Sequence, residues 1–338
     1  MATFWFVILV VLVVAYAILD GFDLGVGALH LALARTDAER RTALNAIGPV
    51  WDANEVWLLG LGVGVFLAFP RAFAVGFSGF YLPLMLVLWL LMGRGIALEF
   101  RHHITDPLWQ GAWDVVFSIS SLLLALLYGV AVGNVVTGVP IDRHGYFQGL
   151  FGWMLNPYAL VMGLFSLALL MLHGAYYLCV KTDGPLHERA RRAGERLWAA
   201  VAVLAAVLTV ATFALRPESL VNYRVQPLWL AVPLAAAWCL VTARRAHRRE
   251  RYGAAFLGSG GLIAALLAAT AIGAYPYLLR SQPFPERSLT VANAASAPSG
   301  LTAAALWLLP GVVLVLAYQV VVYRVFAGKV RIDAGAHY

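Results

Sequence analysis

Long runs of apolar residues, separated by short polar connections, repeat along the whole of this 338-residue chain. An α-helix needs about 20 residues to cross a bilayer core about 30 Å thick, and nine runs approach or exceed that length. The nine runs cover residues 4–33, 47–69, 76–98, 113–137, 157–180, 197–215, 227–243, 254–279 and 301–326. The connections leave no room for a soluble domain. The pattern therefore predicts one all-α integral membrane domain over residues 1–338, with nine transmembrane helices.

The composition agrees with a lipid environment. Hydrophobic residues make up 62% of the chain and charged residues only 12%, whereas about 25% of an ordinary soluble domain is charged. An ordinary soluble enzyme is therefore excluded. The two cysteines, Cys179 and Cys239, both lie in apolar runs and predict neither a disulfide framework nor a cysteine-based metal site.

The net charge of +7 is explained by the distribution of Lys and Arg among the loops, so nucleic acid is not an expected partner. When the loops are assigned alternately to the two sides of a membrane, most of the 24 Lys and Arg residues fall on one side. Cytoplasmic loops are enriched in Lys and Arg, which places the N-terminus outside and the C-terminus in the cytoplasm. The basic runs Arg189–Arg196 and Arg244–Arg251 then predict contact with anionic lipid. Residues 280–300, with three prolines, predict an extended external loop.

Ionisable residues within the first three predicted helices are the best pointers to function, because a charge inside a membrane is costly and is retained for a purpose. They are Asp20, Asp23, Asp52, Glu55, Arg94 and Glu99. The orientation above puts all of them in the cytoplasmic half, with Asp52 and Glu55 about 8–12 Å inside the membrane. One arginine does not neutralise this many acids, so some must be protonated or hydrated. The cluster predicts a proton or cation path that opens to the cytoplasm.

Two other interpretations of these acids stay open at this point. They can be structural groups that pair with Arg94 and fix the packing of the helices. Alternatively, Asp20, Asp23 and Asp52 can be the coupling site of a proton- or cation-driven secondary transporter. Against the transporter, the acids crowd one side of the membrane, and helices five to nine contain no matching acidic motif.

Histidines and glycines inside the predicted spans carry weaker signals. His30 and His173 are haem-ligand candidates, but they lie at different depths, so satisfied buried histidines are the simpler interpretation. A free-standing cytochrome b is a further alternative on these two residues. The glycine pairs spaced by four residues predict close helix contacts; they are Gly21 and Gly25, Gly60 and Gly64, and Gly129 and Gly133.

Several motifs occur in the same order as in a known family. The most specific are Asp20-Gly21-Phe22-Asp23-Leu24-Gly25-Val26-Gly27, Trp51-Asp52 followed by Asn54 and Val56-Trp57, and Phe77-Ser78-Gly79-Phe80-Tyr81. Further along come Arg94 with Glu99, Trp113-Asp114, Gly133-Asn134, Gly138-Val139-Pro140, Leu155-Asn156-Pro157, Tyr275-Pro276 and Leu289-Thr290. With these motifs, which span nearly the whole chain, the sequence resembles subunit II of the cytochrome bd type quinol oxidases.

The resemblance implies a subunit of a respiratory complex that oxidises quinol, reduces dioxygen to water and generates a proton-motive force without a pump. Subunit I, the larger partner, is expected to hold two b-type haems and a haem d, and this chain is expected to ligate none of them. The implied fold is two four-helix bundles and one peripheral helix in the bacterial cytoplasmic (inner) membrane. A structural quinone and small single-helix accessory subunits are left open.

The resemblance also implies a role for this subunit, namely to scaffold subunit I and to supply part of the cytoplasmic proton uptake path. The positions that match the path of the family are Asp23, Asp52, Arg94 and Glu99, and the neighbouring Asp20 and Glu55 join them. Glu99 stands where some members have Asp, and Glu55 where some have a neutral amide. The terminal Tyr338 is expected beside the entrance of the path.

Overall fold

The computed structural model describes residues 1–149 and 151–330 of the chain. Twelve α-helices dominate it: α1 Ala2–Leu33, α2 Asp37–Ile47, α3 Trp51–Ala68, α4 Pro70–Gly79, α5 Tyr81–Phe100, α6 Pro107–Thr137, α7 Pro157–Lys181, α8 Gly184–Leu215, α9 Val221–Val225, α10 Ala231–Arg248, α11 Tyr252–Ala274 and α12 Pro298–Val325. Four short 3-10 helices are η1 Phe151–Leu155, η2 Pro217–Leu220, η3 Pro227–Leu230 and η4 Pro285–Arg287, and the two strands are β1 Tyr277–Leu279 and β2 Leu289–Thr290.

The described residues contain eight helices that are long and apolar enough to cross a membrane. A ninth span is formed if α2 and α3, whose axis bends by 47° at the break between them, are taken together. The prediction of an all-α membrane protein is therefore confirmed, with eight or nine candidate spans. The sidedness of the termini stays a prediction.

Several helices are longer or shorter than their apolar runs, because hydropathy does not register capped polar turns or backbone breaks. α6 begins at Pro107 and not at 113, since the Asp106 side chain caps the backbone N–H groups of Leu108 and Trp109. α8 begins at Gly184 and not at 197; its first turns are polar and are stabilised by ion pairs such as Arg191–Glu188.

Other predicted boundaries are wrong because the apolar run extends beyond the helix. The run at 76–98 crosses a break at Phe80, so α5 begins only at Tyr81. The run at 47–69 begins as a helix only at Trp51, after the chain has turned between α2 and α3. The run at 254–279 ends as a helix at Ala274, and β1 then pairs antiparallel with β2. Pro276 contributes to this ending, since proline has no backbone N–H to donate.

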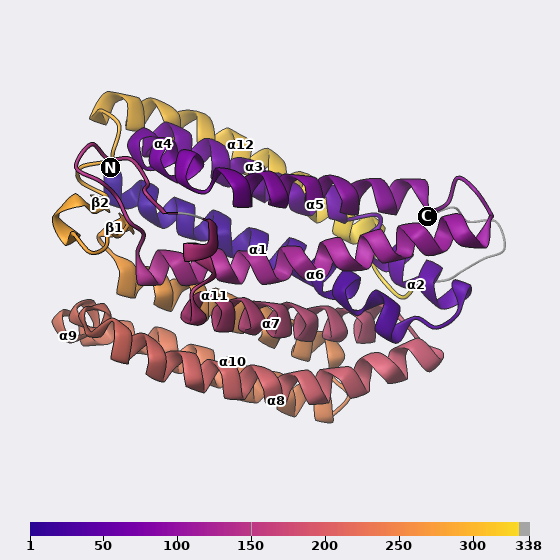
Figure 1. The fold of residues 1–338 in the computed structure, drawn as a ribbon. Coiled ribbons are helices and arrows are strands. Elements are labelled where there is room, and N and C mark those ends of the chain that lie inside the picture. Colours follow the sequence, from indigo (N-terminus) through magenta and orange to yellow (C-terminus); the bar gives the residue numbers. More distant parts are fainter. Residues whose placement is uncertain (150, 331–338) are drawn as a thin grey trace.

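The long helices run side by side, and α1 lies near the centre of the molecule (Figure 1). α1 contacts α3, α6, α7 and α11, while α5 packs on α6, α7 on α8, α10 on α11, and α12 on α3. α6 also packs on α7, so the two halves of the chain share a continuous interior. The division into two four-helix bundles and a peripheral helix stays a prediction.

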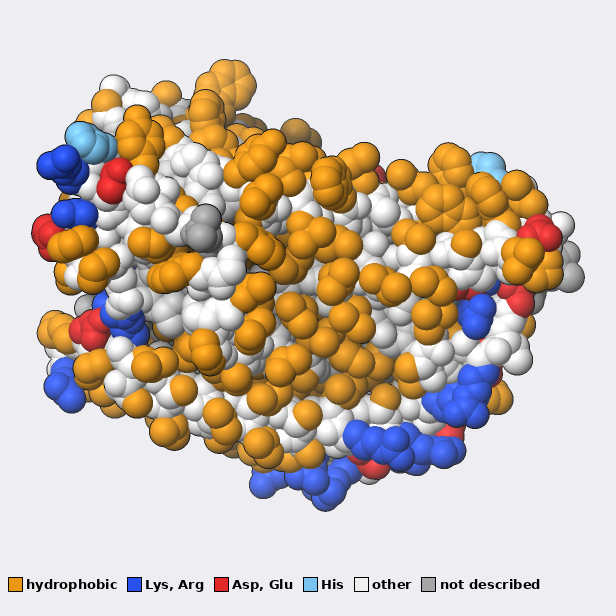
Figure 2. Space-filling view, in the orientation of Figure 1, with side chains coloured by type: hydrophobic (Ala, Val, Ile, Leu, Met, Phe, Trp, Pro, Cys, Tyr) orange, Lys and Arg blue, Asp and Glu red, His pale blue; other side chains and the backbone are white. Residues whose placement is uncertain are grey.

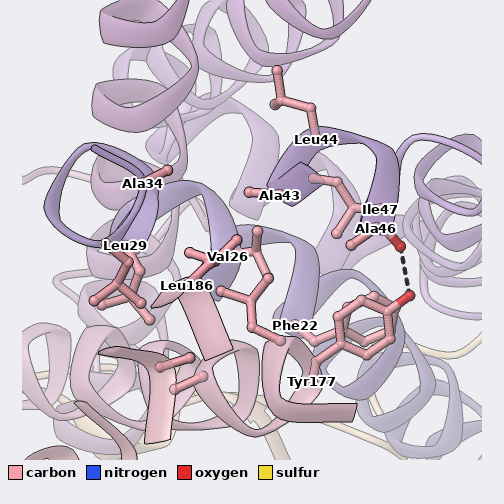
Figure 3. Close-up of a cluster of buried hydrophobic side chains, with 14 of the residues drawn as sticks. Phe22, Val26, Leu29, Ala34, Ala43, Leu44, Ala46, Ile47, Tyr177 and Leu186 are labelled. Atoms are coloured by element: carbon pink, nitrogen blue, oxygen red, sulfur yellow. Dashed lines mark hydrogen bonds between the residues drawn. The ribbon is translucent and has the colours of Figure 1, made fainter. Parts of the chain in front are cut away.

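The short helix α2 closes one end of this interior. Its apolar side chains Ala43, Ala46 and Ile47 face α1, α7 and α8 in a buried hydrophobic cluster (Figure 3). The hydroxyl of Tyr177 on α7 donates a hydrogen bond of 2.7 Å to the carbonyl oxygen of Ala46. α2 is therefore held against the bundle just before the chain enters α3.

The two ends of the bundle differ in charge. We call the end formed by α2, the α5–α6 connection, the start of α8 and the end of α10 the basic end, and the opposite end the N-terminal end. Figure 2 shows hydrophobic side chains across the middle of one face and a dense group of Lys and Arg where α8 starts and α10 ends. Met1 lies at the N-terminal end, and α12 runs from there toward the basic end (Figure 1).

Glycine lets α1 approach α7 to backbone contact. A methyl group at Gly25 would lie 1.9 Å from the carbonyl oxygen of Leu170, and one at Gly174 would lie 2.5 Å from the backbone of α1. The predicted packing role of the Gly21 and Gly25 pair agrees with this contact. The Gly129 and Gly133 pair of α6 makes a similar approach to α7.

We expect Gly25→Ala to destabilise the chain by about 1–3 kcal/mol, the usual range for an overpacked interior. The clash is with backbone, so no side-chain rotation relieves it. The measurement is the thermal unfolding of the detergent-solubilised protein. Gly62→Ala on α3 is the control, because a methyl group there meets nothing within 4 Å; equal unfolding of the two variants would contradict the packing role.

Candidate proton-transfer site

A buried ionic cluster joins three helices in the half of the bundle nearer the basic end. The Arg94 guanidinium on α5 lies 2.7 Å from Asp20 on α1 through Nη1, and 2.5 Å from Glu55 on α3 through Nη2. Asp20 and Arg94 are fully buried, whereas the side chain of Glu55 is 25% exposed. Glu55 is therefore the member of the cluster that reaches the surface of the chain.

Asp23 lies one turn further along α1 and is held by an amide instead of a cation. Asn54 Nδ2 donates to Asp23 Oδ2 at 2.8 Å and to the carbonyl oxygen of Leu19 at 3.0 Å. Asn54 Oδ1 accepts from Gln319 Nε2 at 2.7 Å and from the Tyr323 hydroxyl at 3.0 Å, both on α12. The other carboxyl oxygen of Asp23, Oδ1, is buried and has no hydrogen-bond partner among residues 1–149 and 151–330.

The charges within this cluster do not balance. Asp20, Asp23 and Glu55 supply three carboxyl groups, and in the described part of the chain the one cation paired with any of them is Arg94, which contacts Asp20 and Glu55. A buried site of net negative charge is costly, so the arrangement favours a proton on at least one of the carboxyl groups. It is suited chemically to accepting and releasing protons.

Apolar packing separates the cluster from the N-terminal end. Successive turns of α1 bury Trp5, Leu9 and Leu12 in a hydrophobic cluster that also contains Trp57 of α3. The same hydrophobic cluster includes Tyr16, one turn before Asp20, whose hydroxyl group shares a hydrogen bond of 2.7 Å with that of Tyr128. On the other side, Asp23 is about 15 Å from the end of α1 at the basic end.

The other predicted path residues lie apart from this cluster. Asp52 is in the first turn of α3, nearer the helix start than its apolar run suggests, and is exposed without a hydrogen bond or ion pair to the described residues. Glu99, close to the end of α5, is also exposed. Both are therefore near the basic end, on the surface of the chain. Tyr338 lies outside the described residues.

Three participants were not identified as site residues from the sequence. Asn54 appeared only as a motif residue, and nothing local marked Gln319 or Tyr323 as partners of Asp23. A buried amide such as Gln319 in an apolar helix was the available signal, because uncharged polar groups inside a membrane need partners.

A second buried ionic cluster lies closer to the basic end. Asp114 on α6 contacts Arg101 Nε at 2.6 Å, His30 Nε2 at 2.8 Å and Arg40 Nη1 at 3.0 Å. Arg101 also pairs with Asp37, whose side chain is 54% exposed. These contacts tie the ends of α1, α2, α5 and α6 together. Asp114 was seen in the sequence only as part of a Trp-Asp motif.

The histidines considered as haem ligands both have protein partners. His173 uses both ring nitrogens, with Ser259 Oγ at 2.7 Å and the carbonyl oxygen of Ile18 at 3.1 Å, and His30 uses Nε2 for Asp114. Within the described ranges, no group of three or more His, Cys, Asp or Glu side chains is arranged to hold a metal ion.

Comparison with known proteins gives the family of this chain. A family profile described as cytochrome bd terminal oxidase subunit II matches residues 1–326. The chain belongs to this family. Membership makes it a subunit of a quinol oxidase, an oxidoreductase complex, and a multi-pass bacterial membrane protein. The secondary-transporter alternative is not favoured.

Individual relatives of this subunit II family match over most of their length. A probable cytochrome oxidase subunit 2 of Haemophilus influenzae is 34% identical, covering 98% of this chain and 94% of its own. Cytochrome bd-I ubiquinol oxidase subunit 2 of Escherichia coli is 33% identical, covering 86% and 85%. Cytochrome bd ubiquinol oxidase subunit 2 of Bacillus subtilis is 34% identical, covering 96% of each chain.

A solved structure shares the fold. A chain of the bd oxidase from Geobacillus thermodenitrificans superposes with a TM-score of 0.79 and covers 96% of this chain and 98% of its own, at 21% sequence identity.

Proposed function

We propose that this subunit scaffolds a haem-bearing subunit I and supplies part of the path by which protons reach the site of dioxygen reduction from the cytoplasm. The observation that carries the proposal is the cluster in which Arg94 pairs with Asp20 and Glu55, while Asp23 lies one turn away on an amide and has no cation. Reduction of dioxygen to water consumes protons, and a cluster with more carboxyl groups than cations is able to hold and release them.

The direction of the path follows from the asymmetry of the bundle. The basic end is the cytoplasmic side if the chain obeys the usual bias of Lys and Arg, which puts the N-terminus outside and the C-terminus inside. Trp5, Leu9 and Leu12 then close the cluster toward the outside. Protons enter from the cytoplasm, so that turnover charges the membrane without a pump.

The exit of the path is assigned to Glu55. Glu55 contacts Arg94 and also reaches the surface, while Asp52 lies one turn earlier on the same helix. We infer that subunit I covers this surface of α3 and the end of α5 with Glu99, so that a proton passes from Asp23 and Asp20 through Glu55 to the partner. The role of Tyr338, which lies outside the described residues, stays a prediction.

The remaining assignments follow from the family. The two b-type haems and haem d belong to subunit I, and the complex draws on the quinol pool of the bacterial inner membrane. The hydrogen bonds of His30 and His173 described above favour a structural role for these two histidines. A structural quinone and small accessory subunits remain further partners to be sought by mass spectrometry of the purified complex.

The exposed position of Asp52 gives a first test of the path. We expect Asp52→Asn to slow quinol-driven oxygen consumption by about tenfold or more, because an amide, unlike a carboxylate, does not take up and release a proton. Haem content should stay near that of the wild type, since Asp52 makes no hydrogen bond or ion pair within the described ranges.

The matched control is Asp183→Asn. Asp183 is also exposed at the basic end, where it pairs with Lys329, and it lies on the turn between α7 and α8, away from the cluster. The oxygen consumption of the Asp183→Asn complex should equal that of the wild type. If Asp52→Asn assembles and turns over at the wild-type rate, Asp52 has no part in proton uptake.

A further inference from the structure

Asn54 has a fully determined orientation. Its amide has two N–H donors and an oxygen that accepts two hydrogen bonds, and all four are used. Gln319 Nε2 and the Tyr323 hydroxyl both donate to Oδ1, so this side of the amide must be the oxygen. The nitrogen is thereby directed at Leu19 and Asp23.

Gln319 is itself oriented by Trp57, which lies on α3 one turn after Asn54. Trp57 Nε1, which is a donor only, lies 3.3 Å from Gln319 Oε1. The oxygen of Gln319 therefore faces Trp57, and its NH2 group must face Asn54. Asn54 is fully buried and Gln319 is 7% exposed, so water does not readily replace these partners.

The fixed Asn54 amide makes the two carboxyl oxygens of Asp23 chemically different. Oδ2 receives the N–H of Asn54, so it is the oxygen that carries the C=O character when the carboxyl group is protonated. Oδ1 then bears the proton. Oδ1 is buried and has no hydrogen bond to any residue of the described ranges, so its O–H is not held by the Asn54 network.

We propose that Asn54, Gln319 and Tyr323 are positioning residues that keep the Asn54 N–H on Asp23 Oδ2 and so confine the transferable proton of Asp23 to Oδ1. In each transfer an O–H bond forms at Oδ1 as an incoming donor loses its proton, and the same bond breaks when the proton moves on. The helix α12, which is far from Asp23 in sequence, thereby controls the proton carrier. This inference rests on the proposed proton role of Asp23.

The test uses infrared difference spectroscopy of the whole oxidase complex together with its oxygen consumption. The reference is the C=O stretching band of a protonated carboxyl group that disappears in Asp23→Asn. In Gln319→Leu the oxygen Oδ1 of Asn54 loses one of its two donors, and the Asn54 amide is free to turn. The band should then move to higher wavenumber, because Oδ2 of Asp23 loses the hydrogen bond from Asn54. Oxygen consumption should fall by about tenfold or more, as for other misplaced reacting groups.

A milder variant and a control accompany this change. Tyr323→Phe removes one donor without altering the size of the ring, and should shift the band in the same direction by less. Tyr318→Phe removes a hydroxyl from an exposed side chain of the same helix and should leave band and rate unchanged. Haem content reports assembly in each case.

The outcomes separate the two proposals. If no band depends on Asp23, or if the band stays in place in both Gln319→Leu and Tyr323→Phe, the positioning role is wrong, whatever the rates. If the band shifts while Asp23→Asn consumes oxygen at the wild-type rate, the positioning geometry holds, but the proton role of Asp23 in the proposed function is wrong.

Discussion

Replacing Arg94 by Met should remove most of the assembled oxidase complex from the membrane. The substitution leaves Asp20 fully buried without a cation and removes the partner of Glu55. Breaking a buried ion pair by removing one partner costs about 3–5 kcal/mol, a large part of the stability of most proteins. The measurements are the yield of haem-containing complex and its thermal unfolding in detergent.

A second substitution tests the reason for this loss. Arg94→Met combined with Asp20→Asn removes the uncompensated charge and should recover part of the lost stability. The control is Arg192→Met on α8, whose side chain is 61% exposed and pairs with Glu188; a change within about 0.5 kcal/mol is expected there. Normal assembly of Arg94→Met alone would show that the cluster does not hold the helices together.

Replacing Asp23 by Asn should have the largest effect on turnover without loss of the complex. The two side chains have nearly the same shape, and the amide oxygen is able to accept the N–H of Asn54 in place of Oδ2. The proton carrier is lost, however, and oxygen consumption should fall by about 100-fold, within the usual contribution of a positioned acid or base. Oxygen consumption and haem content are measured on the same purified sample.

The control for Asp23 is Asp106→Asn. Asp106 caps α6 at the basic end, and asparagine caps helices equally well. This variant should assemble and turn over normally. An Asp23→Asn complex with full haem content and undiminished oxygen consumption, reconstituted or in detergent, would remove the main support for proton transfer through this chain.

The sequence predicted the membrane class and the regions that cross the membrane, but it placed several helix ends wrongly. Apolar runs identified the spans because lipid requires apolar side chains along the whole length of a helix. The starts of α6 and α8 escaped this signal, since α6 begins at a side-chain cap and the first turns of α8 are polar and are stabilised by ion pairs. The break at Phe80 is a backbone feature that hydropathy does not register.

For the site, local spacing was sufficient within a helix but not between helices. The interval of three residues placed Asp20 and Asp23 on one side of α1, as the helical period requires. The same interval separates Asp52 from Glu55, yet Glu55 binds Arg94 while Asp52 is exposed. The difference depends on where Arg94 of α5 reaches α3, and the spacing of residues within α3 does not contain this information.

The amino-acid sequence by itself determined that this chain is an all-α membrane protein of the cytochrome bd subunit II family and that its acids gather in its first three helices. Only the tertiary structure decided which groups meet: Arg94 with Asp20 and Glu55, and Asn54 with both Asp23 and the distant Gln319. The physical reason is that hydropathy and helical period describe one helix at a time. Hydrogen bonds and ion pairs between helices depend on their mutual rotation and closeness, which packing contacts such as Gly25 against Leu170 establish.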